Sequence, residues 1–308
     1  YDDRTRLLTL RELMALLGMF CVIAIPAIVE LYDTSLSAKV SAIGIFVLIS
    51  IPIITLNGLY QVPDIKSAKV EAKIENPLKT FRSLFGNVML NKIVFAAGLI
   101  GFCMSLNGAL YLIWMDVVME LPEYSSRLML MYYLVSVLGL GMWRYLSIKT
   151  SKHFAAGVAC FYAIIILLIG FMGFFIVRDL DTDVKLIAVG SFIILYGISF
   201  SGPMPLINAI IADISDKLSL DHDESISGTV FSYLTTITKV GFGLAAVIPY
   251  LVLELIWGFD INLGVENTES SKMAIFYIYT FVPIVCYTIA SYMLFSHSLG
   301  RDEHEKIK

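Results

Sequence analysis

The stretch Gly228–Leu255, GTVFSYLTTITKVGFGLAAVIPYLVLEL, decides the fold class of this chain. It is long and apolar enough to cross a bilayer as a helix, yet it holds a lysine, Lys239, well inside. At 1.5 Å per residue, Lys239 lies about 17 Å from the start of the stretch, near the middle of a ~30 Å hydrocarbon layer. A lysine at that depth costs about 2.5–3.5 kcal/mol, so it needs a partner or a water-filled cavity.

The rest of the chain has the same apolar character. Of its 308 residues 58% are hydrophobic, and the mean hydropathy is +0.80, which is far from soluble globular composition. Eight apolar stretches are long enough to span a membrane, namely Glu12–Leu31, Ala38–Leu59, Ile93–Val117, Arg127–Trp143, Phe154–Val177, Leu186–Ile211, Gly228–Leu255 and Met273–Phe295. The sequence therefore predicts an all-α fold, a polytopic membrane helical bundle.

The basic residues predict the orientation of these spans. With the N-terminus placed in the cytoplasm, Lys and Arg on cytoplasmic segments outnumber those on outer segments by about three to one. We therefore expect both termini of this sequence on the cytoplasmic side of a bacterial-type inner or plasma membrane. The lipid bilayer is then its main partner, and no nucleic-acid partner is expected.

The longest interior connection, residues 61–92, predicts the domain organisation. Its first half is charged, so we interpret it as a central cytoplasmic loop between two bundles. Residues 1–60 would then hold the last two helices of an N-terminal bundle, residues 93–297 a C-terminal six-helix bundle, and residues 298–308 a cytoplasmic tail. Because two spans precede the loop and six follow it, and because the chain opens on Tyr1, we expect an N-terminally truncated fragment of a six-plus-six arrangement.

The sixth predicted span is interrupted by Ser201–Pro205 (SGPMP). Two prolines and a glycine remove backbone hydrogen bonds and kink or unwind a helix. In transporters such a break can mark a binding site, because the freed carbonyls face a cavity. It can equally be a packing kink whose backbone groups are satisfied by neighbouring helices. The sequence leaves both interpretations open.

Two carboxylates follow this break near the predicted cytoplasmic end of the same span. Asp213 and Asp216 are three residues apart and can project from one helical face. Salt bridges to basic residues of other loops would make them a cytoplasmic gate, and a solvated helix end is the alternative. Nothing nearby resembles a nucleophile or a metal ligand, so we expect neither an enzyme nor a metal site here.

A polar face surrounds the mid-span lysine. Thr235 and Lys239 are four residues apart, and Ser232 lies about one turn away on the same side. The acidic residues of the other spans all fall near the outer membrane surface in the predicted orientation. We therefore expect the counter-ion of Lys239 on a helix outside this sequence, the alternative being a lysine buried against backbone carbonyls.

Asn107, Tyr111 and Trp114 give the third span a polar and aromatic face, because they follow one another by four and three residues. Such a face can stack on a sugar ring and bond its hydroxyls. Trp114 alone would be interpreted as an interfacial anchor. Arg11 opens the first span, where an arginine usually sets topology and a ligand role is the alternative.

Two stretches carry a resemblance to a known family. The run Ala212–Asp216, the acidic loop after it, and Gly228 through Gly241 resemble a signature of the glycoside–pentoside–hexuronide:cation symporters. These are the melibiose-carrier-like branch of the major facilitator superfamily. The opening Asp3–Leu7 with Arg11 resembles the stretch that leads into that family's fifth helix. The resemblance covers essentially the whole chain and implies a fragment spanning helices five to twelve.

At the matching positions, the resemblance implies roles for individual residues. Lys239 would be the cation-coupling lysine beside acids of the second helix, and Thr235 would line the same cavity. Arg11 would lie near the sugar, and Asp213 and Asp216 would belong to the cytoplasmic charged network. The implied function is symport of a sugar, glycoside or related organic solute by alternating access. The coupling ion would be Na⁺ or H⁺, and no cofactor is implied.

The chain also departs from the family pattern. Glu224–Gly228 reads ESISG where the family often has basic residues before a Glu-Gly step, and Met204 stands where an aromatic sugar platform would be expected. These departures argue against a melibiose-like substrate more than against membership of the family. The alternative is therefore a major-facilitator transporter of a non-sugar solute such as a drug, a peptide or a nucleoside.

Overall fold

The computed structural model describes residues 2–29, 32, 36–61, 84–221 and 226–296. Within these ranges the regular elements are helices, and no strand occurs among them. In chain order the helices are α1 (Asp2–Val29), α2 (Leu36–Gln61), α4 (Val88–Ile113), α5 (Ser125–Lys149), α6 (Lys152–Val177), α7 (Thr182–Phe200), α8 (Pro203–Asp221), α9 (Ser227–Trp257) and α10 (Glu269–Phe295). A π-helical turn, η1 (Trp114–Val118), extends α4, and short 3₁₀ turns lie at η2 (Pro122–Tyr124) and η3 (Ile261–Glu266).

Seven segments of the described chain are long and apolar enough to cross a membrane, with α7 and α8 forming one of them. The predicted all-α, polytopic membrane bundle is confirmed. The first of the eight predicted spans differs, because the apolar part of α1 is the shorter run Leu13–Ile25. The predicted loop at residues 61–92 lies mostly outside the described residues, and α4 begins within it at Val88.

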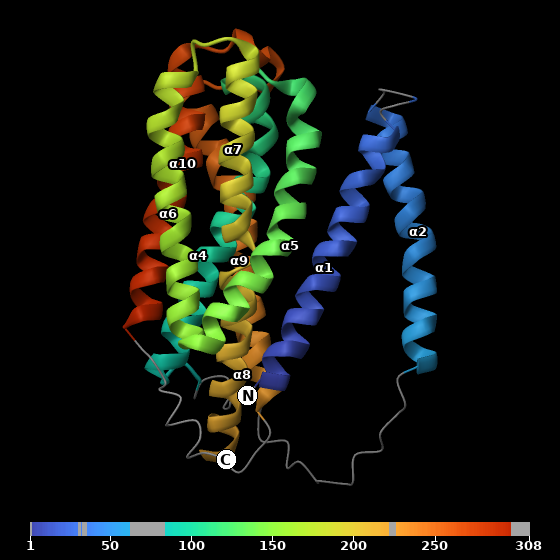
Figure 1. The fold of residues 1–308 in the computed structure, drawn as a ribbon, viewed down its shortest axis with the longest axis vertical. Helices are drawn as coiled ribbons and strands as arrows, with labels where there is room; N and C mark the ends of the chain where they lie inside the picture. Colours follow the sequence, from blue (N-terminus) through green and yellow to red (C-terminus); the bar gives the residue numbers. More distant parts are fainter. Residues whose placement is uncertain (1, 30–31, 33–35, 62–83, 222–225, 297–308) are drawn as a thin grey trace.

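Helices α4 to α10 form one bundle, and α1 and α2 stand beside it as a pair (Figure 1). Helix α1 packs against α5 and α8, whereas α2 packs against α1. The α6–α7 and α9–α10 connections lie at one end, here called the upper end, and the α5–α6 connection lies at the opposite, lower end (Figure 1). Helix α1 begins toward the lower end, where α10 also finishes.

The helix boundaries follow local capping chemistry. The side chains of Asn87, Ser151 and Thr268 accept the backbone N–H groups that open α4, α6 and α10, at 2.9, 3.1 and 3.2 Å respectively. Helix α9 ends at Trp257 and is capped by Gly258, whose φ of 62° lies in the left-handed region that glycine adopts without a steric penalty. Capping residues thus set the ends of helices whose interiors are continuous apolar runs.

The break in the sixth predicted span is a packing kink. Helix α7 ends at Phe200 and α8 starts at Pro203, and Ser201 and Gly202 between them are buried. A Cβ on Gly202 would lie 2.7 Å from Cβ of Ala159 and 2.9 Å from the Trp143 ring, so only glycine fits. The indole N–H of Trp143 donates to the carbonyl of Ile198 at 2.7 Å. A neighbouring helix therefore satisfies a backbone group that the break sets free.

Helices α4 and α9 approach each other more closely than ordinary side chains would permit. A Cβ on Gly241 would lie 2.5 Å from the backbone oxygen of Gly98. Further along the same crossing, the hydroxyl of Ser105 donates to the carbonyl of Phe242 at 3.0 Å, and Tyr250 donates to the carbonyl of Ala109 at 2.6 Å. Small residues with interhelical hydrogen bonds are the usual means of holding membrane helices together.

Candidate functional site

Lys239 lies in an open groove on the surface of α9. Ser232, Thr235 and Thr236 line this groove beside it. The ammonium group lies 5.1 Å from the centre of the Phe242 ring, a cation–π contact. Within the part of the chain that the structure describes, Lys239 forms no ion pair. The structure thus brings Lys239 and Thr235 together on one polar, exposed face.

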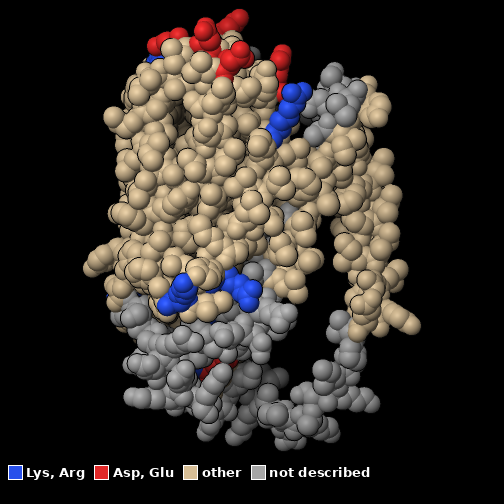
Figure 2. All heavy atoms as spheres, viewed as in Figure 1, with Lys and Arg blue, Asp and Glu red and all other residues tan. Residues whose placement is uncertain are grey.

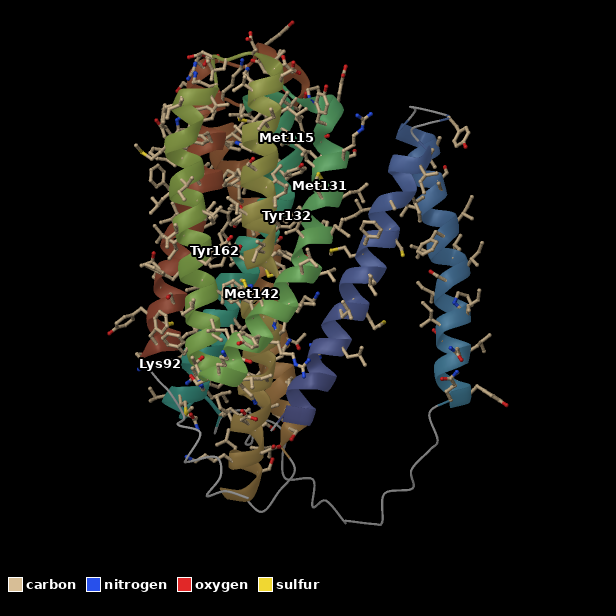
Figure 3. All side chains as sticks on the ribbon, in the orientation of Figure 1. Lys92, Met115, Met131, Tyr132, Met142 and Tyr162 are labelled. Carbon is tan, nitrogen blue, oxygen red and sulfur yellow. The ribbon has the colours of Figure 1, made fainter. Side chains whose placement is uncertain are left out.

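Asn107 and Tyr111 face a different, more enclosed cavity between α4, α5, α7 and α10. Tyrosines from the other three helices complete its wall: Tyr132 and Tyr133 of α5, Tyr196 of α7 and Tyr279 of α10. Tyr132 is labelled on α5 in Figure 3. We call this the tyrosine cavity. Its volume of 40 Å³ holds a water molecule but no sugar ring in this conformation.

Hydrogen bonding in the tyrosine cavity is incomplete. The side-chain amide of Asn107 donates to the hydroxyl of Tyr196 at 2.5 Å, and Tyr111 donates to the carbonyl of Ser125 at 2.9 Å. The carbonyl oxygen of Asn107 is buried and has no partner among the described residues. A buried acceptor without a donor is uncommon in native structures. The cavity therefore offers an acceptor and aromatic faces to a ligand that carries hydroxyl groups.

Trp114 does not join Asn107 and Tyr111. It opens the π-helical turn η1, and its ring stacks on Tyr279 at 5.0 Å with an interplanar angle of 2°. Trp114 lines a second cavity on the side of α6 and α7, and Tyr279 borders both this cavity and the tyrosine cavity. The continuous polar and aromatic face expected from the residue spacing is therefore divided by the Tyr279 ring.

Asp213 pairs with Lys152, the first residue of α6. The Lys152 Nζ atom lies 2.6 Å from Oδ2 of Asp213, and the two side chains are 2% and 12% exposed. This bridge joins α6 to α8 inside one bundle, near its lower end. Asp216 lies three residues further along α8 and is half-buried. The gating role of the two carboxylates stays a prediction.

A family model described as MFS/sugar transport protein, the melibiose-carrier-like family, matches residues 1–301. The chain belongs to this family. No curated protein matches it. As a member of the MFS sugar-transport family, the chain is a multi-pass integral membrane transporter, and a small-molecule sugar is the expected substrate class.

In this MFS sugar transporter the predicted site residues occupy separate places. Arg11 is exposed on α1 and lines neither the Lys239 groove nor the tyrosine cavity. Those two features share no lining residue. The structure therefore pairs Thr235 with Lys239 and Asn107 with Tyr111. It does not assemble all of the predicted substrate residues into one pocket.

Sequence reasoning missed the residues that complete these sites. The doublet Tyr132-Tyr133 on the fourth span is a local signal that could have been followed, because two adjacent tyrosines are unusual in an apolar helix. Tyr196 and Tyr279 are single tyrosines in long spans, and only the fold brings them to Asn107. Lys152 is one of the basic residues that predict the orientation of the spans, and its burial becomes visible only when α6 packs on α8.

Proposed function

We propose that this MFS sugar transporter couples the movement of a sugar, glycoside or related organic solute to that of a cation, Na⁺ or H⁺, by alternating access. The observation that carries the proposal is Lys239. It places a fixed positive charge about halfway along a spanning helix, beside three hydroxyls, with no carboxylate partner among the described residues. A neutral sugar does not require such a charge, so we assign it to the coupling ion.

The coupling would operate through competition for a carboxylate outside the described residues. Without the ion, that carboxylate pairs with Lys239, because both charges need compensation in a low-dielectric layer. Binding of Na⁺, or of a proton, neutralises the carboxylate and releases the lysine ammonium. The ammonium, Ser232 and Thr235 can then bond the hydroxyls of the solute. Ion occupancy thereby raises solute affinity, which is the thermodynamic requirement for symport.

The remaining predicted residues have defined places in this proposal. Asn107 and Tyr111 would contact the sugar once the tyrosine cavity widens, with Arg11 contributing from α1. Trp114 would hold the Tyr279 ring in position through their stacking contact. Asp213 and Asp216 would close the lower end of the transporter, and we assign that end to the cytoplasm.

Uptake by proteoliposomes that contain the full-length protein tests the proposal. We expect an imposed Na⁺ or H⁺ gradient to stimulate uptake of one member of a radiolabelled glycoside panel. Lys239→Ala should abolish this stimulation, whereas Lys149→Ala, which removes an exposed lysine that contacts only Tyr145 among the described residues, should preserve it. Normal gradient-driven uptake by Lys239→Ala would refute the coupling role. No sugar uptake under either gradient would instead favour a non-sugar solute.

A further inference from the structure

An apolar cavity of 220 Å³, the one that Trp114 lines, opens between α6 and α7 next to the tyrosine cavity, with which it shares Phe192 and Tyr279. Its wall includes Gly170, Gly173 and Phe174 of α6, and Phe192 and Leu195 of α7. We call it the α6–α7 groove. It is larger than the roughly 150 Å³ engineered apolar cavity that stays dry and binds benzene. An unfilled apolar volume of this size forgoes dispersion contacts that an apolar occupant would restore.

A missing side chain on α6 keeps part of the groove open. A Cβ built on Gly173 meets no atom within 4 Å, so the space beside this residue is unoccupied. At Gly170, by contrast, a Cβ would lie 2.5 Å from the Phe192 ring, which already packs there. The groove thus has one filled and one open glycine position along the same helix.

The mouth of the groove faces the lipid phase. Ile169, which lines the groove, is 58% exposed, and the large apolar residues Met172, Ile176 and Ile187 on the same two helices are 65%, 70% and 70% exposed. Because the chain spans a membrane, acyl chains cover these side chains. Anything that enters the groove from this side therefore comes from the hydrocarbon layer.

A cation without an ion-pair partner lies above the groove. Lys185 is on α7, one turn before the lining residues Ala188 and Val189, and it forms no ion pair with a described residue. Arg178, at the end of α6, is already paired with Asp179 at 3.2 Å and Glu269 at 3.6 Å. A lysine near a helix end extends its ammonium toward the interface, where lipid phosphates lie.

The length of the groove matches one leaflet. Ten residues separate Lys185 from Leu195, which is about 15 Å along a helix at 1.5 Å per residue. This equals half of the roughly 30 Å hydrocarbon thickness of a bilayer. A chain that enters beside Lys185 and follows α7 would therefore reach Leu195 near the bilayer midplane.

We propose that the α6–α7 groove is a binding site for one phospholipid, with an acyl chain packed along Gly170 and Gly173 and its phosphate at Lys185. Gly170, Gly173 and Lys185 line neither the Lys239 groove nor the tyrosine cavity, whereas Phe192 and Tyr279 border both the α6–α7 groove and the tyrosine cavity. Occupation of the site would fill the space between α6 and α7 and stabilise their packing.

Photocrosslinking in liposomes tests this site. The full-length protein is reconstituted with a phospholipid that carries a mid-chain diazirine, irradiated, and digested for mass spectrometry. We expect adducts concentrated on residues 166–195. Gly173→Leu should reduce these adducts about tenfold, because a leucine side chain occupies the acyl path. Lys185→Gln should reduce them about fivefold, the factor that one lysine typically contributes toward an anionic headgroup.

Matched controls separate the site from general lipid contact. Gly44→Leu adds the same side chain to an exposed, open position on α2, and Lys149→Gln removes an exposed lysine at the lower end. Both should leave the α6–α7 adducts unchanged, and thermal unfolding should show that Gly173→Leu is folded. Adducts of equal yield in wild type and Gly173→Leu, or no enrichment over α2, would overturn the site. An unchanged yield in Lys185→Gln would overturn the phosphate contact.

Discussion

Lys152 is 2% exposed, so its ammonium group has lost nearly all of its hydration. The carboxylate of Asp213 at 2.6 Å therefore contributes to its charge balance. Buried ion pairs add little net stability compared with apolar residues of similar volume, because desolvation offsets the attraction. Removal of one partner is different, since it leaves a charge in a medium that solvates it poorly.

We therefore expect Asp213→Asn to lower the free energy of unfolding by roughly 3–5 kcal/mol. The double change Lys152→Met with Asp213→Leu should recover most of this loss. Denaturant unfolding of the purified protein measures both. Asp179→Asn serves as the control, because that carboxylate is 81% exposed and its pair with Arg178 should contribute at most about 1 kcal/mol. Equal losses for Asp213→Asn and Asp179→Asn would contradict this account.

At the scale of helices, glycine positions determine which spans pack most closely. The α4–α9 crossing depends on Gly98 and Gly241, and α5 meets α7 through Gly139 and Gly197, where a Cβ would lie 2.5 and 2.7 Å from backbone oxygens of the neighbouring helix. In a bilayer, where apolar side chains gain little by leaving lipid, such close backbone contacts supply much of the association energy.

Gly241→Ala tests this packing by adding a single methyl group at the α4–α9 crossing. The added carbon would overlap the Gly98 oxygen, so the helices must separate, and we expect a loss of about 1–3 kcal/mol. Gly243→Ala lies two residues away on the same helix and meets no atom within 4 Å, so it should be neutral or slightly stabilising. Thermal unfolding of both variants in detergent gives the comparison. A melting temperature for Gly241→Ala at or above that of Gly243→Ala would show that the crossing tolerates a side chain.

The helices themselves were predictable from sequence because hydropathy and length define a membrane span almost completely. Their finer properties were not. Prolines and glycine located the break at Ser201–Pro205, but only the Trp143–Ile198 hydrogen bond distinguishes a packing kink from a binding site. In α1 the apolar run Leu13–Ile25 is shorter than the predicted span Glu12–Leu31, and nearly all of the difference lies after Ile25, where the sequence continues with Pro26 and reaches Glu30.

For the candidate site, the sequence predicted which residues of one helix lie together more reliably than which residues of different helices meet. Residues three or four apart on one helix share a face, as Thr235 and Lys239 do. Convergence of different helices depends on tertiary packing, which is why Tyr196 and Tyr279 were missed and why Trp114 lines an adjoining cavity rather than that of Asn107 and Tyr111. A polar residue within a span signals a site, whereas a tyrosine is compatible with core, interface and cavity alike.

At the scale of the whole molecule, the charged side chains of the described residues mark one end of the bundle. Acidic side chains gather at the upper end (Figure 2). They belong to the connections there and to the adjoining helix ends, as for Glu123, Asp181 and Glu266. Acidic residues hardly influence insertion, whereas the basic residues predict that the lower end is cytoplasmic.

Thiol accessibility tests this orientation. In a background without Cys21, Cys103, Cys160 and Cys286, the exposed positions Thr150→Cys and Asp181→Cys mark the lower and upper connections. In intact cells a membrane-impermeant maleimide should label Asp181→Cys and leave Thr150→Cys unmodified until the membrane is opened. The reverse pattern would place the termini outside and contradict the charge-based prediction.

The backbone contact between α4 and α9 has a mechanical consequence. A pair of helices held at Gly98 and Gly241 and hydrogen-bonded through Ser105 and Tyr250 has little freedom to slide, because any shift breaks several contacts at once. The two helices then move as one rigid unit. A displacement of α9 at Lys239 therefore also moves α4 at Asn107. In this way the proposed binding of a cation near Lys239 would change the shape of the tyrosine cavity through the helix pair itself, with no chain of side chains between the two places.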